Sequence, residues 1–337
     1  VMRAIRGASL VGVSICTCSG NAPTGTDNHI GGEWRPLLVD CPERGGGPAP
    51  HDSIPWTGGI VWPSLHEGAS WSQQGMIAYA DNGLECVIER ADGSALFDPD
   101  LRGIWIIDPN TGEKTRVVDR GRNPSWSPDG NRIAFEYSRQ IYVVEIGGGR
   151  ITQLTDGGRN FFPAWSPEGS WIAYDSNAGG VQDIWLVQPG GTGRHVLDPP
   201  EPNGRRFPAW HPVGRRILYS SWADSHNQEI YEINLDDAEV RLVAQRPEFE
   251  QEEEPTYSVD GEWIAFESLD GDGIPAYQIW TMRTDGTDQA QLTACGGNDP
   301  AWSPDGKMIV YTKYLDNGSP ENGVLWLIDV SNRTEKQ

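Results

Sequence analysis

Basic residues are scarce in this 337-residue sequence: Lys and Arg number 26 against 48 Asp and Glu, which gives a net charge of −22. A surface of this sign repels nucleic-acid backbones and anionic lipid headgroups, so nucleic acid is excluded as a partner. Near the N-terminus, the apolar stretch from Ala8 to Ile15 is much shorter than the roughly 20 residues that cross a bilayer. Contact with a membrane is therefore expected only through a lipid anchor.

Motifs for catalysis and metal binding are also missing. The sequence contains no Gly-x-Ser-x-Gly, no His-Glu-x-x-His, no paired Cys-x-x-Cys and no phosphate-binding glycine loop, and its six histidines are scattered. The run from Asp270 to Gly273 is similar to the start of a calcium loop, but Ile274 and Pro275 stand where further oxygen ligands would be needed. We therefore predict no enzyme activity, no metal site and no cofactor.

Glycine (41), proline (25) and tryptophan (15) are abundant, and a repeat accounts for much of this composition. The pattern Pro-Ala-Trp-Ser-Pro-Asp-Gly-x-x-Ile-Ala-Tyr recurs at residues 124–135, 163–174 and 300–311, with weaker copies at 69–79, 208–219 and 255–266. Ser, Pro and Gly in Ser-Pro-Asp-Gly occupy the positions that a type I turn favours. The marker aromatics of the copies are Trp71, Trp126, Trp165, Trp210, Tyr257 and Trp302.

Each copy continues with further strand-forming segments. An apolar pair such as Ile104-Trp105 or Leu325-Trp326 follows every turn, and a second pair such as Val117-Val118 follows the first five. This predicts an all-β fold, a six-bladed β-propeller with four-stranded antiparallel blades. The last copy has no recognisable fourth strand before the chain ends, so the N-terminal strand around Ile60 is expected to pair with the last blade and close the ring.

The repeated Ala-Trp-Ser-Pro-Asp-Gly followed by Ile-Ala-Tyr resembles the TolB-like β-propeller repeat family over about residues 58–330. The resemblance implies the propeller fold, in a family that includes many exported proteins, and it leaves the function open. The family also includes propellers attached to prolyl oligopeptidase-type hydrolases. Their serine motif and hydrolase domain are not found here, and a Gly/Pro-rich segment stands where TolB itself has an α/β domain.

Three segments are expected along the chain. Residues 1–18 place Arg3 and Arg6 before a short apolar run, which predicts an export signal. The run ends in a segment similar to a bacterial lipoprotein processing site, so Cys18 is predicted to carry a lipid, with Cys16 as the alternative. Residues 19–53 are a predicted Gly/Pro-rich tether, and residues 54–337 are the predicted propeller. The protein is then expected in the periplasm or at the outer membrane or cell surface of a Gram-negative bacterium.

The remaining cysteines allow a covalent link beside the ring closure. Cys86 and Cys295 belong to loops expected on one face of neighbouring blades, and an oxidising compartment permits a disulfide between them. Free thiols, or pairing of either with Cys41, remain alternatives.

The segments that precede the six inner strands are expected to meet at one mouth of the central channel. Arg and Phe side chains come from blades 2 to 4, and carboxylates come mainly from blades 5, 6 and 1, so the mouth is predicted to be divided in charge. Exchanging both Arg205 and Arg206 for Glu is expected to weaken partner capture and to leave the melting temperature nearly unchanged. The predicted partner-binding residues are Glu67, Arg122, Asn123, Arg159, Phe162, Arg205, Arg206, Phe207, Glu253, Glu254 and Asp299.

The leading hypothesis is a non-catalytic exported scaffold that binds a protein or peptide partner at this mouth. One alternative is a carbohydrate-binding or lyase-like propeller, for which Trp222, outside the repeat, is a candidate surface residue. A second alternative is a structural accessory subunit of a larger cell-envelope assembly.

Overall fold

The computed structural model describes residues 61–62, 66–81, 87–88, 102–197, 204–222, 228–244, 249–270, 277–294, 296–314, 323–333 and 335–336. Every regular element among these residues is a β-strand. None of the described segments forms a helix of the length and hydropathy that a membrane crossing requires.

The strands form groups of four that follow one another along the chain. Group 1 contains β2 (His66–Trp71), β3 (Ile77–Asp81), β5 (Gly103–Ile107) and β6 (Lys114–Val118). Group 2 contains β7 (Arg122–Trp126), β8 (Arg132–Tyr137), β9 (Gln140–Glu145) and β10 (Ile151–Gln153). Group 3 contains β11 (Asn160–Trp165), β12 (Ile172–Ser176), β13 (Asp183–Val187) and β14 (His195–Val196).

Groups 4 and 5 share one eight-stranded sheet, because β17 and β19 form a single parallel pair at Gln228 and Gln251. Group 4 contains β15 (Arg206–Trp210), β16 (Arg216–Trp222), β17 (Gln228–Asn234) and β18 (Val240–Ala244). Group 5 contains β19 (Phe249–Tyr257), β20 (Trp263–Asp270), β21 (Gln278–Arg283) and β22 (Ala290–Gln291). Group 6 contains β23 (Asn298–Trp302), β24 (Met308–Tyr314), β25 (Gly323–Asp329) and β26 (Glu335–Lys336).

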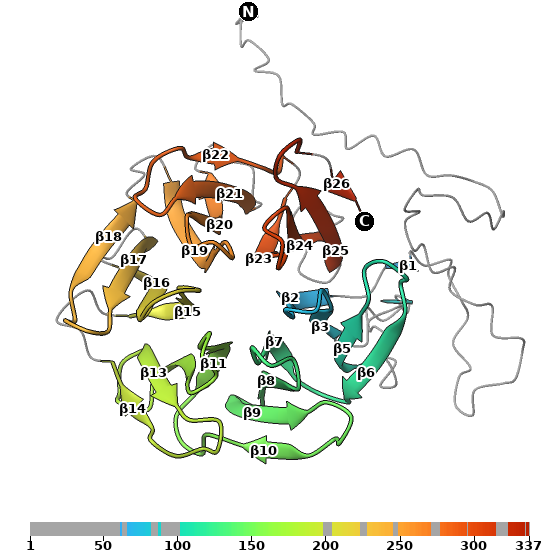
Figure 1. Ribbon diagram of the computed structural model, residues 1–337, viewed down its shortest axis with the longest axis vertical. Coiled ribbons are helices and arrows are strands. Elements are labelled where there is room, and N and C mark those ends of the chain that lie inside the picture. Colours follow the sequence, from blue (N-terminus) through green and yellow to red (C-terminus); the bar gives the residue numbers. More distant parts are fainter. Residues whose placement is uncertain are drawn as a thin grey trace, which may run out of the picture. The chain divides into compact units, whose positions relative to one another are not determined.

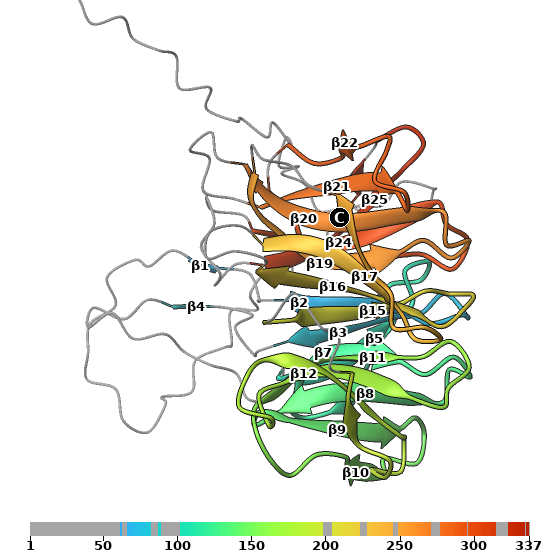
Figure 2. The ribbon, with the colours of Figure 1, turned by 90° about the vertical axis from the view of Figure 1, so that its left-hand side faces the viewer.

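The groups are arranged round a ring as an all-β propeller with antiparallel sheets (Figure 1). The first strand of each group lies nearest the centre, and the ring is seen edge-on in Figure 2. β2 contacts β7 on one side and β23 on the other, so the first and last groups pack against each other. The predicted class of fold and the four-strand repeat are therefore confirmed.

The hydrophobic core lies between neighbouring groups. One cluster joins Ile104 of group 1 to Ile133 and Phe135 of group 2, and another joins Leu218 of group 4 to Phe266 of group 5. The Ile-Ala-aromatic segments supply these contacts because each second strand is covered on both faces, which its unbroken apolar run anticipates. Burying both faces of each sheet is what holds the groups in a ring.

Strand pairing at the ends of the chain differs from the prediction. The strand expected near Ile60 was to complete group 6, but β26 holds that outer position, pairing through Leu327 with Lys336. The short strand β1 (Val61–Trp62) pairs instead with β4 (Val87–Ile88). The Asp329 carboxylate accepts the Ser331 N–H at 2.9 Å, which turns the chain back at once, so the fourth strand is formed from few residues. The prediction of closure by a shared strand is therefore wrong.

The Ser-Pro-Asp-Gly turns are built as the sequence predicts. In group 6 the Gly306 N–H donates to the Ser303 carbonyl at 2.9 Å, and Gly306 has a φ of 70°. The Ser303 hydroxyl accepts the Met308 N–H at 2.9 Å and donates to Asp305 at 2.6 Å. The equivalent serines Ser127 and Ser258 make the same contacts.

Replacing Ser303 by Ala is expected to lower the free energy of unfolding by about 1–2 kcal/mol, because the Met308 N–H loses its partner at a buried turn. Urea unfolding of the variant would measure this. Ser331→Ala is the matched control: its exposed hydroxyl donates to Asp329 within the same turn, and we expect a change within about 0.5 kcal/mol. Equal losses for the two variants would contradict the role given to the turn serine.

Candidate functional site

One position in each inner strand has left-handed backbone geometry. It directly precedes Pro in five groups and Ala69 in group 1, and each strand carries a register shift there. Five of the six residues are not glycine, and such geometry costs about 1–3 kcal/mol for a residue with a Cβ, so the surrounding structure must enforce it. These residues are Gly68, Asn123, Phe162, Phe207, Glu254 and Asp299, with φ between 48° and 56°. We call them the mouth ring.

Neighbours in the mouth ring touch in pairs. A Cβ at Gly68 would lie 2.9 Å from the Asn123 Cα atom, so a side chain there would collide with backbone. The rings of Phe162 and Phe207 meet edge to face with centroids 4.4 Å apart. Burial raises the pKa of Glu254, and the neighbouring Asp299 carboxylate raises it further. The mouth ring therefore has a small polar sector in groups 1 and 2, an aromatic sector in groups 3 and 4 and an acidic sector in groups 5 and 6. The predicted division into a basic and an acidic half stays a prediction.

Arg206 joins the aromatic sector to a buried carboxylate. Its guanidinium lies 4.4 Å from the ring centroid of Phe207 and 5.6 Å from that of Phe162. Its Nε donates to Asp175 at 3.4 Å. Burial, reinforced by Glu136, raises the pKa of the Asp175 carboxyl to about 7, and the Arg206 charge holds it from rising further. A cation that contacts two aromatic rings and also pairs with a carboxylate is held in position, so it can form one side of a binding site.

The acidic sector gathers carboxylates from groups 5 and 6. The Glu267 carboxylate accepts the Asn298 side-chain N–H at 2.9 Å and the Asp299 backbone N–H at 3.3 Å. Burial raises the pKa of Glu253, and burial together with neighbouring carboxylates raises the pKa of both Glu254 and Glu267 well above the usual range. The raised pKa values favour the protonated carboxyls, and each proton that leaves adds negative charge to this sector.

Two of the predicted mouth residues are buried. Arg205 is 1% exposed, and its Nη1 donates to Asp183 at 2.7 Å inside the fold, so it is no surface anchor. Phe207 is 6% exposed, beneath Arg206. Side chains alternate along a strand, and the three residues before each proline therefore point in different directions, whereas the sequence reasoning placed them together. The buried positions equivalent to Arg205 include Asn160 and Glu252.

The other predicted residues divide between exposed and undescribed positions. Arg122 and Arg159 are exposed, and Asn123 donates from its side chain to Glu136 at 3.1 Å. The side chain of Glu67 lies outside the described residues, as do Cys18, Cys86 and Cys295. Lipidation and the disulfide therefore stay predictions. Among the residues that the structure describes, no three His, Cys, Asp or Glu side chains are arranged to hold a metal ion.

Three carboxylates that contact the mouth were not predicted from the sequence. Glu136, Asp175 and Glu267 each follow the Ile-Ala-aromatic segment of a second strand, and all three contact residues of the mouth. The signal was present, because an acidic residue directly after a buried apolar run is unusual and needs a partner.

Comparison with known proteins places the fold. Residues 200–336 match the TolB beta propeller domain, and residues 102–208 match the dipeptidyl peptidase IV N-terminal region. The uncharacterized protein Atu1656 of Agrobacterium fabrum is 28% identical over 207 residues, which are 57% of this chain and 65% of that protein. The uncharacterized peptidase YuxL of Bacillus subtilis is 31% identical over 86 residues, 23% of this chain and 13% of that protein. The chain thus spans less than two thirds of either relative.

Solved structures agree on the architecture. TolB from Acinetobacter baumannii superposes with a TM-score of 0.63 at 19% identity, covering 78% of this chain and 63% of that one. A putative TolB from Agrobacterium tumefaciens gives 0.60 at 23% identity, covering 69% and 86%. The propeller of the Trilobed protease from Pyrococcus furiosus, described as having an open velcro topology, gives 0.52 at 12% identity, covering 81% and 97%. These similarities establish a propeller fold of the TolB kind.

Proposed function

We propose, from the premise that the chain belongs to the TolB-like β-propeller family, that it is a non-catalytic scaffold whose mouth ring binds a segment of a protein partner. In this proposal the four-strand groups are six blades of one ring, and the first and last blades are held by face packing. Export and an N-terminal lipid at Cys18 belong to the same proposal.

The observation that carries the proposal is the division of the mouth. Arg206, stacked on Phe162, stands on the side of groups 3 and 4, whereas Glu254 and Asp299 stand on the side of groups 5 and 6. An extended peptide that crosses this mouth meets a cationic, aromatic wall at one end and carboxylates at the other. This arrangement of charge orients a peptide that carries an acidic or aromatic residue near one end and a basic residue near the other. Aromatic and arginine side chains are the usual anchors of interfaces.

A selection from a display library of random linear peptides tests this proposal. We expect the enriched peptides to carry opposite charges near their two ends. Arg122→Glu with Arg159→Glu changes two exposed arginines that precede the mouth ring in groups 2 and 3, and it is expected to weaken binding of a synthesized enriched peptide about tenfold or more in fluorescence anisotropy.

The matched control combines Arg150→Glu with Lys307→Glu, which makes the same change in net charge at exposed positions outside the mouth ring. This control is expected to bind the peptide within about twofold of the wild type, because surface charges beyond a Debye length of about 10 Å are screened at 0.1 M salt. Equal weakening in both double variants, or a library that yields no enriched peptide, would contradict the proposal.

A further inference from the structure

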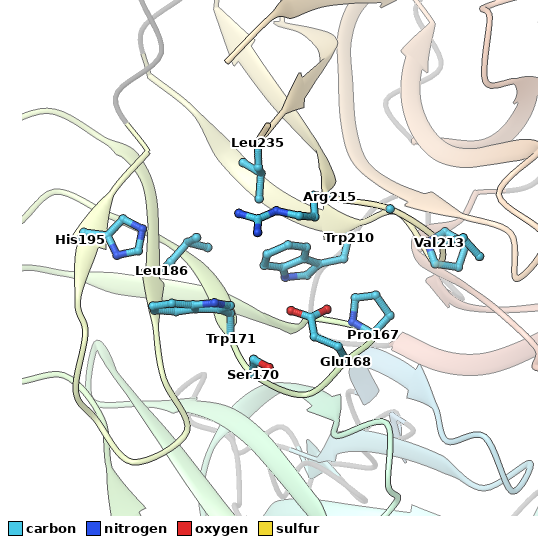
Figure 3. A pocket seen from close by; sticks show the side chains of 12 residues that line it. Pro167, Glu168, Ser170, Trp171, Leu186, His195, Trp210, Val213, Arg215 and Leu235 are labelled. Atoms are coloured by element: carbon cyan, nitrogen blue, oxygen red, sulfur yellow. The ribbon is translucent and has the colours of Figure 1, made fainter. Parts of the chain in front are cut away.

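A second concave site lies between groups 3 and 4, at the other end of β15 from Phe207. It is a pocket of about 670 Å³, within the range of about 300–1,000 Å³ typical of small-molecule sites. Two tryptophans line it: Trp171, which directly precedes β12, and Trp210, the last residue of β15. Figure 3 shows Arg215 and Glu168 flanking Trp210 on opposite sides, with His195 beyond Leu186.

Differences between repeats explain why the pocket opens at this place. In group 2 the position of Trp171 is taken by Arg132, whose guanidinium lies 4.7 Å from the ring centroid of Trp165, the marker of the next group. In group 5 it is taken by Trp263, which Arg283 covers at 4.4 Å. Trp171 instead meets the edge of His195, with ring centroids 5.2 Å apart, and it lines the pocket together with Trp210.

The turn of group 4 also departs from its sister turns. His211 replaces the turn serine, and the Val213 N–H donates to the His211 ring at 3.1 Å. Val213 stands where groups 2, 5 and 6 have Asp129, Asp260 and Asp305, and it is 72% exposed at the rim of the pocket. Its side chain adds apolar surface to the pocket that Trp171 and Trp210 also line.

The chemistry of the lining selects a ligand class. Flat indole faces carry partial negative charge and attract polarised C–H groups, which the faces of gluco-configured pyranose rings present because their substituents are equatorial. The edges of such a sugar carry hydroxyls, and the pocket rim offers a carboxylate at Glu168, a hydroxyl at Ser170 and a guanidinium at Arg215. The pocket is lined by one carboxylate, Glu168, and one guanidinium, Arg215, and Arg215 already pairs with Asp236 at 3.1 Å. Because the lining carries both signs of charge, the complementary ligand is uncharged.

We propose that this pocket, which we call the Trp171/Trp210 pocket, binds a neutral oligosaccharide of gluco-configured sugars by stacking on the two indoles. The site is separate from the mouth ring, because Phe207 and Trp210 stand at opposite ends of the same strand. Binding at one does not require binding at the other.

Titration calorimetry of the full chain with cellotetraose and with triacetylchitotriose tests the proposal. We expect saturable binding of at least one of them and a tenfold or greater loss in Trp171→Ala. Trp263→Ala is the matched control, since it removes a tryptophan from the same repeat position outside the pocket, and it is expected to bind within twofold of the wild type. Val213→Asp restores the residue type of the sister turns at an exposed position, and it is expected to weaken binding without a change of fold.

A decaproline peptide tests the alternative that the pocket binds a proline-rich segment of a protein. We expect the wild-type protein not to bind this peptide. No saturable binding of either saccharide, equal loss in Trp171→Ala and Trp263→Ala, or binding of decaproline in place of the saccharides would overturn the proposal. Peptide binding at the mouth ring can fail or succeed independently of these results.

Discussion

Arg205→Ala is expected to lower the free energy of unfolding by about 3–5 kcal/mol, because it leaves the Asp183 carboxylate buried without its charged partner. The pair is sequestered on both sides, with Arg205 1% exposed and its Nη1 2.7 Å from Asp183. Asp183 also accepts the Ile184 N–H at 2.7 Å, which fixes the carboxylate in place. Urea unfolding followed by tryptophan fluorescence measures the effect.

Arg159→Ala is the control for this prediction. Arg159 is an exposed arginine that begins the equivalent segment of group 3, and its loss is expected to change the free energy of unfolding by less than about 0.5 kcal/mol. A loss below about 1 kcal/mol for Arg205→Ala would contradict the buried pair. The result also decides how mouth variants are designed, because a charge reversal at Arg205 would damage folding before it affected binding.

Raising the pH from 5 to 8 is expected to destabilise the protein by about 2–3 kcal/mol through Asp175 alone. The pKa of this carboxyl rises from 3.8 to about 7 on folding, so at pH 5 the folded state keeps a proton that the unfolded state has released. The stabilisation is complete below pH 3.8 and disappears as the pH passes 7. The raised pKa values of Glu253, Glu254 and Glu267 act in the same direction.

Other carboxyls oppose this trend only in stronger acid. Hydrogen bonds within the turns lower the pKa of Asp129, Asp260 and Asp305, so their contribution is lost below about pH 4. Asp175→Asn is expected to flatten the loss between pH 5 and pH 8, measured as unfolding free energy at each pH. Asp156→Asn, at an exposed ion pair, is the control and is expected to keep the wild-type slope. An unchanged slope in Asp175→Asn would contradict the assignment.

The repeat made most of the fold predictable. Turn chemistry at Ser127, Ser258 and Ser303 followed from local residue preferences, and the doubly covered second strands followed from their apolar runs. The fourth strand of group 6, β26, was not predicted, because a strand of two residues leaves no periodic signal. It is stabilised by the turn at Asp329.

The site was predictable only in outline. The position of the mouth ring followed from the repeat, because each group offers the residue before its proline, or before Ala69, at the same place. The predicted division of charge stays a prediction. The burial of Arg205 could not be predicted from the sequence. It depends on the bulge at Phe207, which has left-handed backbone geometry, and on the position of Asp183. The Trp171/Trp210 pocket was not predicted either, because in the sequence both tryptophans resemble ordinary packing positions. The structure shows that the equivalent Trp263 is covered by Arg283, whereas Trp171 lines the pocket together with Val213.

The most direct test of the central claim is a crystal structure of the chain bound to a peptide selected from the display library. The account predicts a peptide across the mouth ring, with its acidic or aromatic part against Arg206 and Phe162 and its basic part against Glu254 and Asp299. A peptide bound on the outer strands, or in the Trp171/Trp210 pocket with the mouth ring empty, would contradict it.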